Sequence, residues 1–126
     1  MPPPPRLHEL ESEVMEELWA SGESSVRSVM DALNGRASKD RAYTTYMTIM
    51  ARLYRKGMLT RRREGKTDFY APAHERPEYM RLRAGADVDE LLEQYGDAAL
   101  THFAQHVQAL DPARRRALQR LAREGR

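Results

Sequence analysis

The sequence predicts a mainly α-helical protein with one small β-hairpin. Three stretches in the first 56 of its 126 residues repeat apolar side chains at helical spacing. Two strand-like runs then flank the turn Glu64-Gly65-Lys66, and helical patterning returns after Pro72. Three helices followed by a basic two-stranded hairpin is the element order of a winged helix-turn-helix, so the fold class is predicted as a winged helix-turn-helix followed by a separate helical domain.

The chain is expected to divide into three parts. Residues 1–6 form a flexible tail, because the prolines at positions 2–5 favour a mobile polyproline-II segment; a ligand role for this PxxP motif is the alternative. Residues 7–73 form the winged-helix domain and residues 74–126 the helical domain. The sequence has no cysteine, no apolar run of membrane length and no signal-peptide core, so we expect a cytoplasmic protein.

The first two helices are predicted from apolar spacing and from their ends. The first covers about ten residues and stops near Ser21-Gly22, with Leu10, Val14, Met15, Leu18 and Trp19 as its apolar residues. Its glutamates are interpreted as a solvated face. The second helix is capped by Ser24 or Ser25 and ends at Asn34-Gly35, where the glycine supplies a left-handed exit. Its buried stripe is Val26, Val29, Met30 and Leu33, and the polar linker RASKDR follows.

The third helix is predicted from about Tyr43 to Lys56, with Gly57 just after its C-cap. Its core stripe lies within about 60° of Tyr46 on a helical wheel and consists of Tyr46, Ile49, Met50 and Leu53. The opposite face is hydroxylic in its first half and cationic in its second, with Thr44, Thr48, Ala51 and Arg55 flanked by Thr45, Met47 and Arg52. Such a face suits a helix that enters a major groove, although similar faces are common on solvated helices.

The distribution of charge indicates a nucleic-acid partner. The formal net charge is only +2, but residues 36–66 hold ten Lys and Arg against two acids, a local net charge of +8. Residues 1–35 carry −5 and residues 67–126 carry −1. A basic segment confined to one quarter of the chain is the footprint of a polyanion site. We therefore expect the third helix to read DNA and the strands Met58–Glu64 and Thr67–Pro72 to form a wing on its backbone.

The helical domain is predicted as several short helices. They run from about Pro77 to Ala84, from an N-cap at Asp87 to Gly96, from Asp97, and from the cap-proline pair Asp111-Pro112. Short helices with more apolar surface than they can bury alone suggest a partner chain, and operator DNA is usually two-fold symmetric. Homodimerisation is therefore favoured over a lid on the chain's own winged helix. The predicted dimerisation residues are Tyr79, Leu82, Val88, Leu91, Leu92, Tyr95, Leu100, Phe103, Val107, Leu118 and Leu121.

Neither catalysis nor metal binding is predicted. His102 and His106 share a helix face, but no cysteine and no evident third ligand accompany them, so both are interpreted as polar surface or interface residues. The sequence has no glycine-rich phosphate loop, and serine and histidine fall in no recognisable catalytic order. We expect neither an enzyme nor a cofactor.

Several strings of the sequence occur together in one known family. They are LHELESEVMEELW in the first helix, YTTYMTIMARLYRKGML through the third helix and first strand, FYAP at the end of the wing and, more weakly, ELLEQYGDAALTHFAQHV and LDPARRRALQRL. In these strings, which extend from about Leu7 to Leu121, the chain resembles the penicillinase-repressor family of winged-helix transcriptional repressors.

The resemblance implies a dimeric repressor of antibiotic-resistance or stress genes. Its winged helix would bind a palindromic operator with TACA…TGTA-like half-sites, and its C-terminal helices would form the dimer. The matching segment implies that the third helix contacts bases and that wing cations lie near phosphate. With the face selected on the helical wheel, the predicted DNA-binding residues are Arg41, Tyr43, Thr44, Thr45, Met47, Thr48, Arg52, Arg55, Arg61, Arg63 and Lys66.

Two departures from the family pattern concern how such a repressor is released. Studied members are inactivated by proteolysis at an Asn-Phe bond, but His102 precedes Phe103 here, which argues against cleavage at that bond. The copper-responsive branch uses cysteine pairs, which this chain lacks. An upstream sensor or protease therefore stays unassigned. The rival interpretations are a winged-helix regulator of another family switched by a small molecule, and a winged-helix protein-interaction module.

Overall fold

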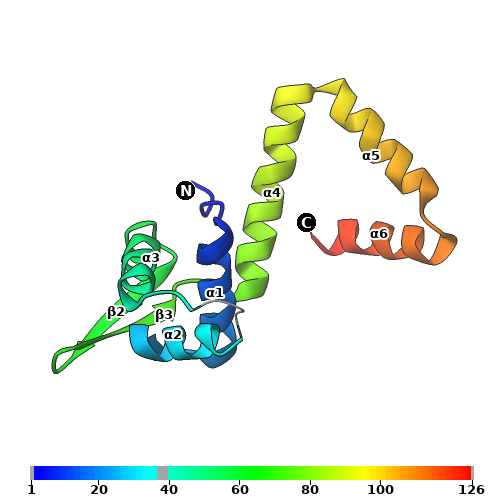
Figure 1. The fold of residues 1–126 in the computed structure, drawn as a ribbon. Coiled ribbons are helices and arrows are strands. Elements are labelled where there is room, and N and C mark those ends of the chain that lie inside the picture. Colours follow the sequence, from blue (N-terminus) through cyan, green and yellow to red (C-terminus); the bar gives the residue numbers. More distant parts are fainter. Residues whose placement is uncertain (1, 37–39, 126) are drawn as a thin grey trace. The chain divides into compact units, whose positions relative to one another are not determined.

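The computed structural model describes residues 2–36 and 40–125, so residues 37–39 of the predicted linker lie outside the described part (Figure 1). The elements are α1 (Glu9–Ser21), β1 (Ser24–Ser25), α2 (Val26–Asn34), α3 (Tyr43–Arg55), β2 (Leu59–Glu64), β3 (Thr67–Pro72), α4 (Arg76–Tyr95), α5 (Asp97–Ala109) and α6 (Pro112–Glu124). This mainly helical architecture with a small antiparallel sheet confirms the predicted fold class. None of the described helices is long and apolar enough to cross a membrane.

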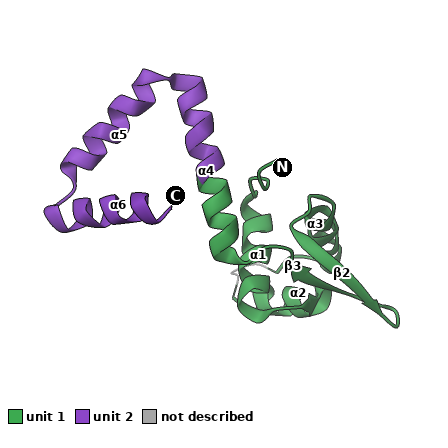
Figure 2. Cartoon of the chain, turned by 180° about the vertical axis from the view of Figure 1, so that it is seen from behind, with its two compact units in different colours: residues 1–84 green, residues 85–126 purple. Residues whose placement is uncertain are grey.

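The chain divides into two compact units, residues 1–84 and residues 85–126 (Figure 2). The first unit holds the hydrophobic core, where α1, α2 and α3 pack together with the sheet. The core residues are Val14, Met15, Leu18, Val26, Val29, Tyr46, Met50, Leu53, Met58, Leu59, Tyr70 and Tyr79. Most residues of the core stripes expected for the first three helices are therefore buried. The others are partly buried at the margin of the core; they are Leu10, Trp19, Met30, Leu33 and Ile49.

Local sequence signals account for most element ends. The Ser25 hydroxyl caps α2 by accepting a hydrogen bond from the Ser28 N–H at 3.2 Å. Gly57 follows α3 with φ +83°, and Gly65 turns the hairpin with φ +62°, conformations that side chains with a Cβ rarely adopt. The Asp111 carboxylate caps α6 by accepting from the Arg114 N–H at 2.8 Å. These four predicted signals are confirmed.

The sheet has one strand more than predicted. Its order is β1-β3-β2, and all pairs are antiparallel. Ser24 pairs with Tyr70 and Ser25 with Phe69, while β2 pairs with β3 from Leu59–Pro72 to Glu64–Thr67. The two-residue β1 forms because the extended backbone that makes Ser25 an N-cap also fits a sheet ladder. The predicted two-stranded hairpin is therefore confirmed, and β1 adds a third strand that the sequence analysis did not predict.

Two helix boundaries also differ from the prediction. Gly35 has φ −64°, so the left-handed exit expected after α2 is wrong, and α2 ends in a right-handed turn. The break expected before Asp87 does not exist, because α4 continues from Arg76 to Tyr95. Gly85 lowers helix propensity at that point, but a single glycine does not stop a helix whose hydrogen-bond ladder is otherwise intact.

The N-terminal prolines do not form the free tail that was expected. Pro4 is buried, and its carbonyl accepts a hydrogen bond from Arg83 Nη1 at 2.7 Å. The Pro5 carbonyl accepts from the Tyr79 hydroxyl at 2.9 Å. The tail is ordered because proline carbonyls remain good acceptors although the ring nitrogens cannot donate. These contacts also hold the start of α4 in the first unit, which extends to Ala84.

The acids of α1 are not all solvated, which corrects the interpretation of the first helix. Glu11 is fully buried and accepts from Lys56 Nζ at 2.8 Å and from the His8 backbone N–H at 2.9 Å. Glu17 is buried beside Arg36 and Ser21. Each buried carboxylate has a cationic partner on another segment, which offsets the cost of removing its charge from water.

Candidate nucleic-acid interface

The position of α3 is set at its start by the side chain of Asn34. The Asn34 Oδ1 accepts from the Arg41 backbone N–H at 3.1 Å and from the Tyr46 hydroxyl at 2.7 Å. Its Nδ2 donates to the Arg41 carbonyl at 3.0 Å. Because Tyr46 is fully buried, its hydroxyl needs this partner. Asn34 therefore joins the end of α2 to the first turn of α3.

The outer face of α3 is free of core packing. Met47 is 44% exposed and Tyr43 is 42% exposed. Thr45 and Arg41 are half-buried, and the other predicted contact residues of this helix, Thr44, Thr48, Arg52 and Arg55, are exposed. The helix thus presents methyl and hydroxyl groups near its N-terminus and guanidinium groups near its C-terminus. That arrangement can meet thymine methyls, base edges and phosphate oxygens.

The wing places its three consecutive arginines on alternate faces, as a strand must. The guanidinium of Arg61 lies 4.3 Å from the centre of the Tyr54 ring, so its face of the hairpin adjoins α3. Arg62 points to the other face and is paired with Glu23 at 2.6 Å and Glu64 at 2.7 Å. Arg63 shares the face of Arg61 and donates weakly to the Gly65 carbonyl at 3.4 Å.

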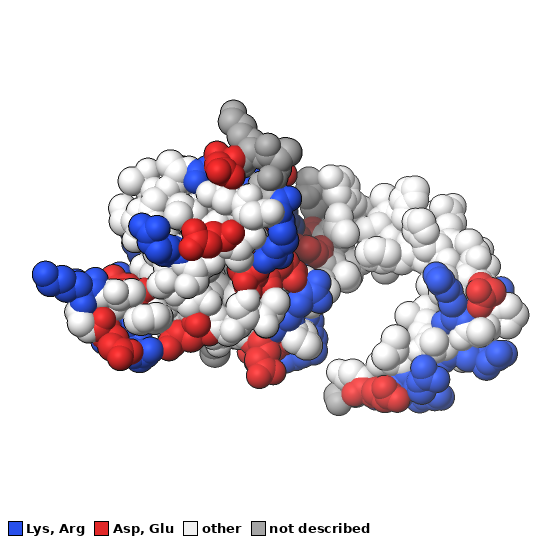
Figure 3. Space-filling view, turned by 60° about the horizontal axis from the view of Figure 1, so that its bottom comes forward, with Lys and Arg blue, Asp and Glu red and all other residues white. Residues whose placement is uncertain are grey.

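The net charge of +8 on residues 36–66 is partly neutralised by acids that lie far away in the sequence. Lys56 and Arg62 are engaged by Glu11 and Glu23, acids of the first 35 residues. Within the described part of the chain, five of the predicted DNA-binding cations form no ion pair with a carboxylate; they are Arg52, Arg55, Arg61, Arg63 and Lys66. Figure 3 shows Lys and Arg at the tip of the hairpin and acids interspersed nearer its base.

Arg27 is a candidate that the sequence did not reveal. Its guanidinium lies 5.9 Å from the centre of the Tyr43 ring, beside the N-terminal turn of α3. Arg27 was overlooked because the first 35 residues carry a net negative charge. In this fold, however, the start of α2 lies beside the helix that reads DNA. Arg41, which was predicted to bind DNA, forms an ion pair with Glu13, with 3.6 Å between Nη2 and Oε2.

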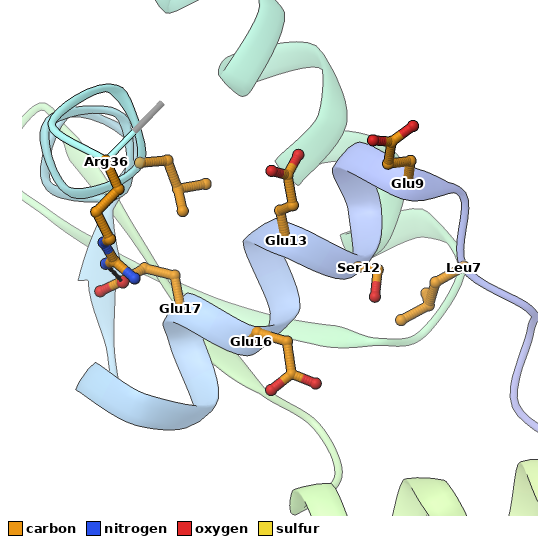
Figure 4. Close-up of a pocket in the computed structure, with 8 residues that line it drawn as sticks. Leu7, Glu9, Ser12, Glu13, Glu16, Glu17 and Arg36 are labelled. Carbon is orange, nitrogen blue, oxygen red and sulfur yellow. Dashed lines mark hydrogen bonds and ion pairs between the residues drawn. The ribbon is translucent and has the colours of Figure 1, made fainter. Parts of the chain in front are cut away.

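The surface along α1 is acidic, in contrast to the cationic surface of α3 and the wing. A hollow of about 650 Å³ is lined by Leu7, Glu9, Ser12, Glu13, Glu16, Glu17, Leu33 and Arg36 (Figure 4). Arg36 is directed at Glu17, whereas the carboxylates of Glu9, Glu13 and Glu16 are exposed or half-exposed around the hollow. An acidic surface of this kind disfavours phosphate, in contrast to the cationic outer face of α3 and the wing.

Comparison with known proteins identifies the family. A sequence model of the penicillinase repressor matches residues 7–124. The chain is a member of the penicillinase-repressor family. It is 43% identical over 122 residues to the transcriptional regulator BlaI of Mycobacterium tuberculosis, in strains CDC 1551 / Oshkosh and ATCC 25618 / H37Rv, covering 92% of this chain and 85% of those proteins. It is a BlaI-like transcriptional repressor and not an enzyme.

Two solved structures of BlaI support the same assignment. The solution structure of the DNA-binding domain of the repressor BlaI matches with a TM-score of 0.53 at 26% identity, over 63% of this chain and 94% of that one. The Bacillus licheniformis BlaI monomeric form in complex with the blaP half-operator matches with a TM-score of 0.51 at 26% identity and equal coverage. The first part of this penicillinase-repressor family member is therefore similar in fold to the DNA-binding domain of BlaI.

The second unit of this family member exposes most of the residues predicted for dimerisation. Val88, Leu91, Tyr95, Leu100, Phe103, Val107, Leu118 and Leu121 are 36–60% exposed, and Leu92 is half-buried. Leu82, which lies in the first unit, is also half-buried. Tyr79 differs, because it is 5% exposed in the first unit, where its ring lies 5.6 Å from that of Trp19. Its role in dimerisation stays a prediction. His102 lines an apolar hollow of about 350 Å³ with Leu91, Tyr95, Ala98, Ala99 and Phe103.

Proposed function

We propose that the chain acts as a homodimer that binds a palindromic operator through the two copies of its winged helix. The outer face of α3 lies in the major groove, and Arg61, Arg63 and Lys66 of the wing lie against the phosphate backbone. The observation that carries this proposal is the 4.3 Å contact of Arg61 with Tyr54, because it aligns the cationic face of the wing with the outer face of α3.

The dimer is formed by the second unit. Its helices carry at least eight large apolar side chains that are a third or more exposed. Monomeric proteins rarely expose contiguous apolar patches of large size, and a second copy of the chain supplies a matching surface by symmetry. The apolar hollow beside Phe103 is then filled by the partner chain.

Repression follows from occupancy. A dimer on promoter DNA denies polymerase the same surface, and the controlled genes are those of antibiotic resistance or stress. Phosphate contacts give most of the affinity, whereas Thr44, Thr45, Met47 and Thr48 discriminate between base sequences. This division of labour makes the two groups of residues separable by mutation.

A fluorescence-anisotropy titration tests the DNA part of the proposal. A duplex with TACA…TGTA half-sites is compared with a scrambled duplex of equal length over a salt series. We expect two chains per operator duplex and an affinity that falls on the order of 10³-fold between about 50 and 200 mM salt. Thr48→Ala should reduce the preference for the operator, and Lys66→Ala should weaken both duplexes about equally. The same pattern of loss in both variants would contradict the division of labour.

Sedimentation equilibrium tests the dimer. Leu100→Glu places a charge on the exposed apolar face of α5 and should raise the dimer dissociation constant by about 30-fold or more. Gln105→Glu adds the same charge to the same helix away from that face and should have little effect. Equal behaviour of the two variants, or a wild-type chain that stays monomeric, would favour the alternative in which a small molecule occupies the apolar hollow.

A further inference from the structure

Arg62 is held by acids, unlike its two neighbours on the same strand. Its Nε donates to both carboxylate oxygens of Glu23 at 3.2 Å, and its Nη2 donates to Glu23 Oε1 at 2.6 Å. Its Nη1 donates to Glu64 Oε2 at 2.7 Å. Its guanidinium also lies 5.0 Å from the centre of the Phe69 ring. A bidentate pair with a second carboxylate and an aromatic face is more restrained than an ordinary surface ion pair.

The pair connects the wing to the three helices. Glu23 lies in the short connection between α1 and β1, whereas Arg62 lies in the middle of β2. Across the sheet, Arg62 is opposite Phe69, and Phe69 is opposite Ser25. Glu23 and Arg62 thus join the two outer strands on one face of the sheet, and Arg61 and Arg63 are left on the face that adjoins α3.

We propose that the Glu23–Arg62 pair is a brace that positions the wing for the DNA backbone, and that Arg62 itself does not bind phosphate. This inference rests on the proposed function. Past Leu59 the residues of β2 are all exposed, so little packing fixes the direction of the hairpin. A wing held in its bound direction before DNA arrives loses less conformational freedom on binding, and the affinity is higher for that reason.

The direction in which one substitution changes the DNA affinity distinguishes a positioning role of the pair from a purely electrostatic one. Glu23→Gln removes a negative charge close to the proposed DNA surface, so electrostatics alone predicts tighter binding. Loss of the brace predicts weaker binding of a duplex, by about tenfold for a dimer with one brace in each wing. Glu16→Gln is the matched control, because Glu16 forms a similarly exposed pair with Arg76 at 3.0 Å on a surface away from the wing.

The measurement is an anisotropy titration of the full-length wild type, Glu23→Gln, Arg62→Gln and Glu16→Gln on operator and scrambled duplexes at several salt concentrations. We expect Glu23→Gln and Arg62→Gln to weaken both duplexes by a similar factor, with the salt slope unchanged, and Glu16→Gln to match wild type. Thermal melting and the stoichiometric end point identify a folding defect, which lowers the active fraction rather than the affinity of the folded chain.

Two results would overturn the brace while leaving operator binding intact. One is tighter binding by Glu23→Gln, which assigns the acid a purely repulsive role. The other is a salt slope that falls by about one per chain in Arg62→Gln, which makes Arg62 a phosphate contact. A wild-type chain that does not distinguish the operator from the scrambled duplex would instead contradict the proposed function.

Discussion

The two units of this repressor bury their apolar side chains to very different extents. The first unit encloses twelve apolar residues in a continuous core, and the buried carboxylates of Glu11 and Glu17 have partners. Among the described residues of the second unit, Ala99 is the only apolar side chain that is buried. Both units have ordinary amphipathic helices, so the difference lies in what covers the apolar faces. The first unit buries its apolar residues within one chain, whereas most large apolar side chains of the second unit are exposed in a single copy, which is the surface that the proposed dimer would cover.

The largest effect that tests this contrast is expected from Leu53→Ala. Leu53 is fully buried between α3 and the rest of the core. Truncation should lower the free energy of unfolding of the first unit by about 3 kcal/mol, from lost burial and the cavity left behind. Urea unfolding followed by the fluorescence of Trp19, the single tryptophan of the chain, measures it. A loss below about 1 kcal/mol would show that the core can be repacked and is not the tight assembly described.

Lys56→Ala should have an effect nearly as large, although it removes a half-buried lysine. The substitution leaves the Glu11 carboxylate buried without its cation, which costs about 3 kcal/mol in comparable buried pairs. Arg76→Ala is the control, because its pair with Glu16 is exposed and should contribute less than about 1 kcal/mol. If the two variants unfold at the same urea concentration, the Glu11–Lys56 pair does not stabilise the first unit.

The stability of the first unit should also depend on pH in the acid range. Burial opposes ionisation of Glu11, but the His8 N–H and the Lys56 ammonium outweigh it and hold the pKa of Glu11 below its usual value. The hydrogen bond from Ser21, together with Arg36, lowers the pKa of Glu17 in the same way. Carboxylates with a lowered pKa in the folded state stabilise the protein above their unfolded pKa, and this stability is lost as pH falls through the folded pKa.

Urea titrations at pH values from neutral to about 3 check this expectation. The Trp19 transition should weaken as the pH falls below the usual range of glutamate, by about 1 kcal/mol or more. Glu17→Gln provides the comparison, because it removes one of the two titrating groups and should flatten the acid limb. An acid limb identical to that of wild type would assign the pH dependence to other carboxylates.

Much of the first unit could be predicted because its signals are local. The serine cap of α2, the glycine after α3 and the glycine of the hairpin turn act within a few residues of their own position. The exposed face of α3 followed from helical periodicity alone. What could not be predicted depends on residues far apart in the chain. Pairing of Lys56 with Glu11 and of Arg62 with Glu23 spans 45 and 39 residues, so no local charge count reveals it.

The same reason explains the errors at the ends of the first unit. The proline tail becomes ordered only because Tyr79 and Arg83, more than seventy residues away, donate to its carbonyls. The pair of serines before α2 becomes a strand only because Phe69 and Tyr70 are adjacent in space. Tyr79 shows that helical periodicity predicts an apolar face but does not identify what that face contacts, because the ring of Tyr79 lies beside Trp19 of the first unit.

The smallest effect on unfolding is expected from Leu121→Ala. It is the same chemical change as Leu53→Ala, made at an exposed position of the second unit instead of a buried position of the first. Leu121 is 60% exposed, so in a dilute sample its truncation should change the free energy of unfolding by less than about 0.5 kcal/mol. At concentrations where the chain is dimeric, a difference from wild type should emerge, because dimerisation stabilises the folded state by mass action. Helix content followed by circular dichroism over a range of protein concentrations measures both limits. A loss as large as that of Leu53→Ala and independent of concentration would mean that the second unit has a core of its own, and the contrast between the units would then disappear.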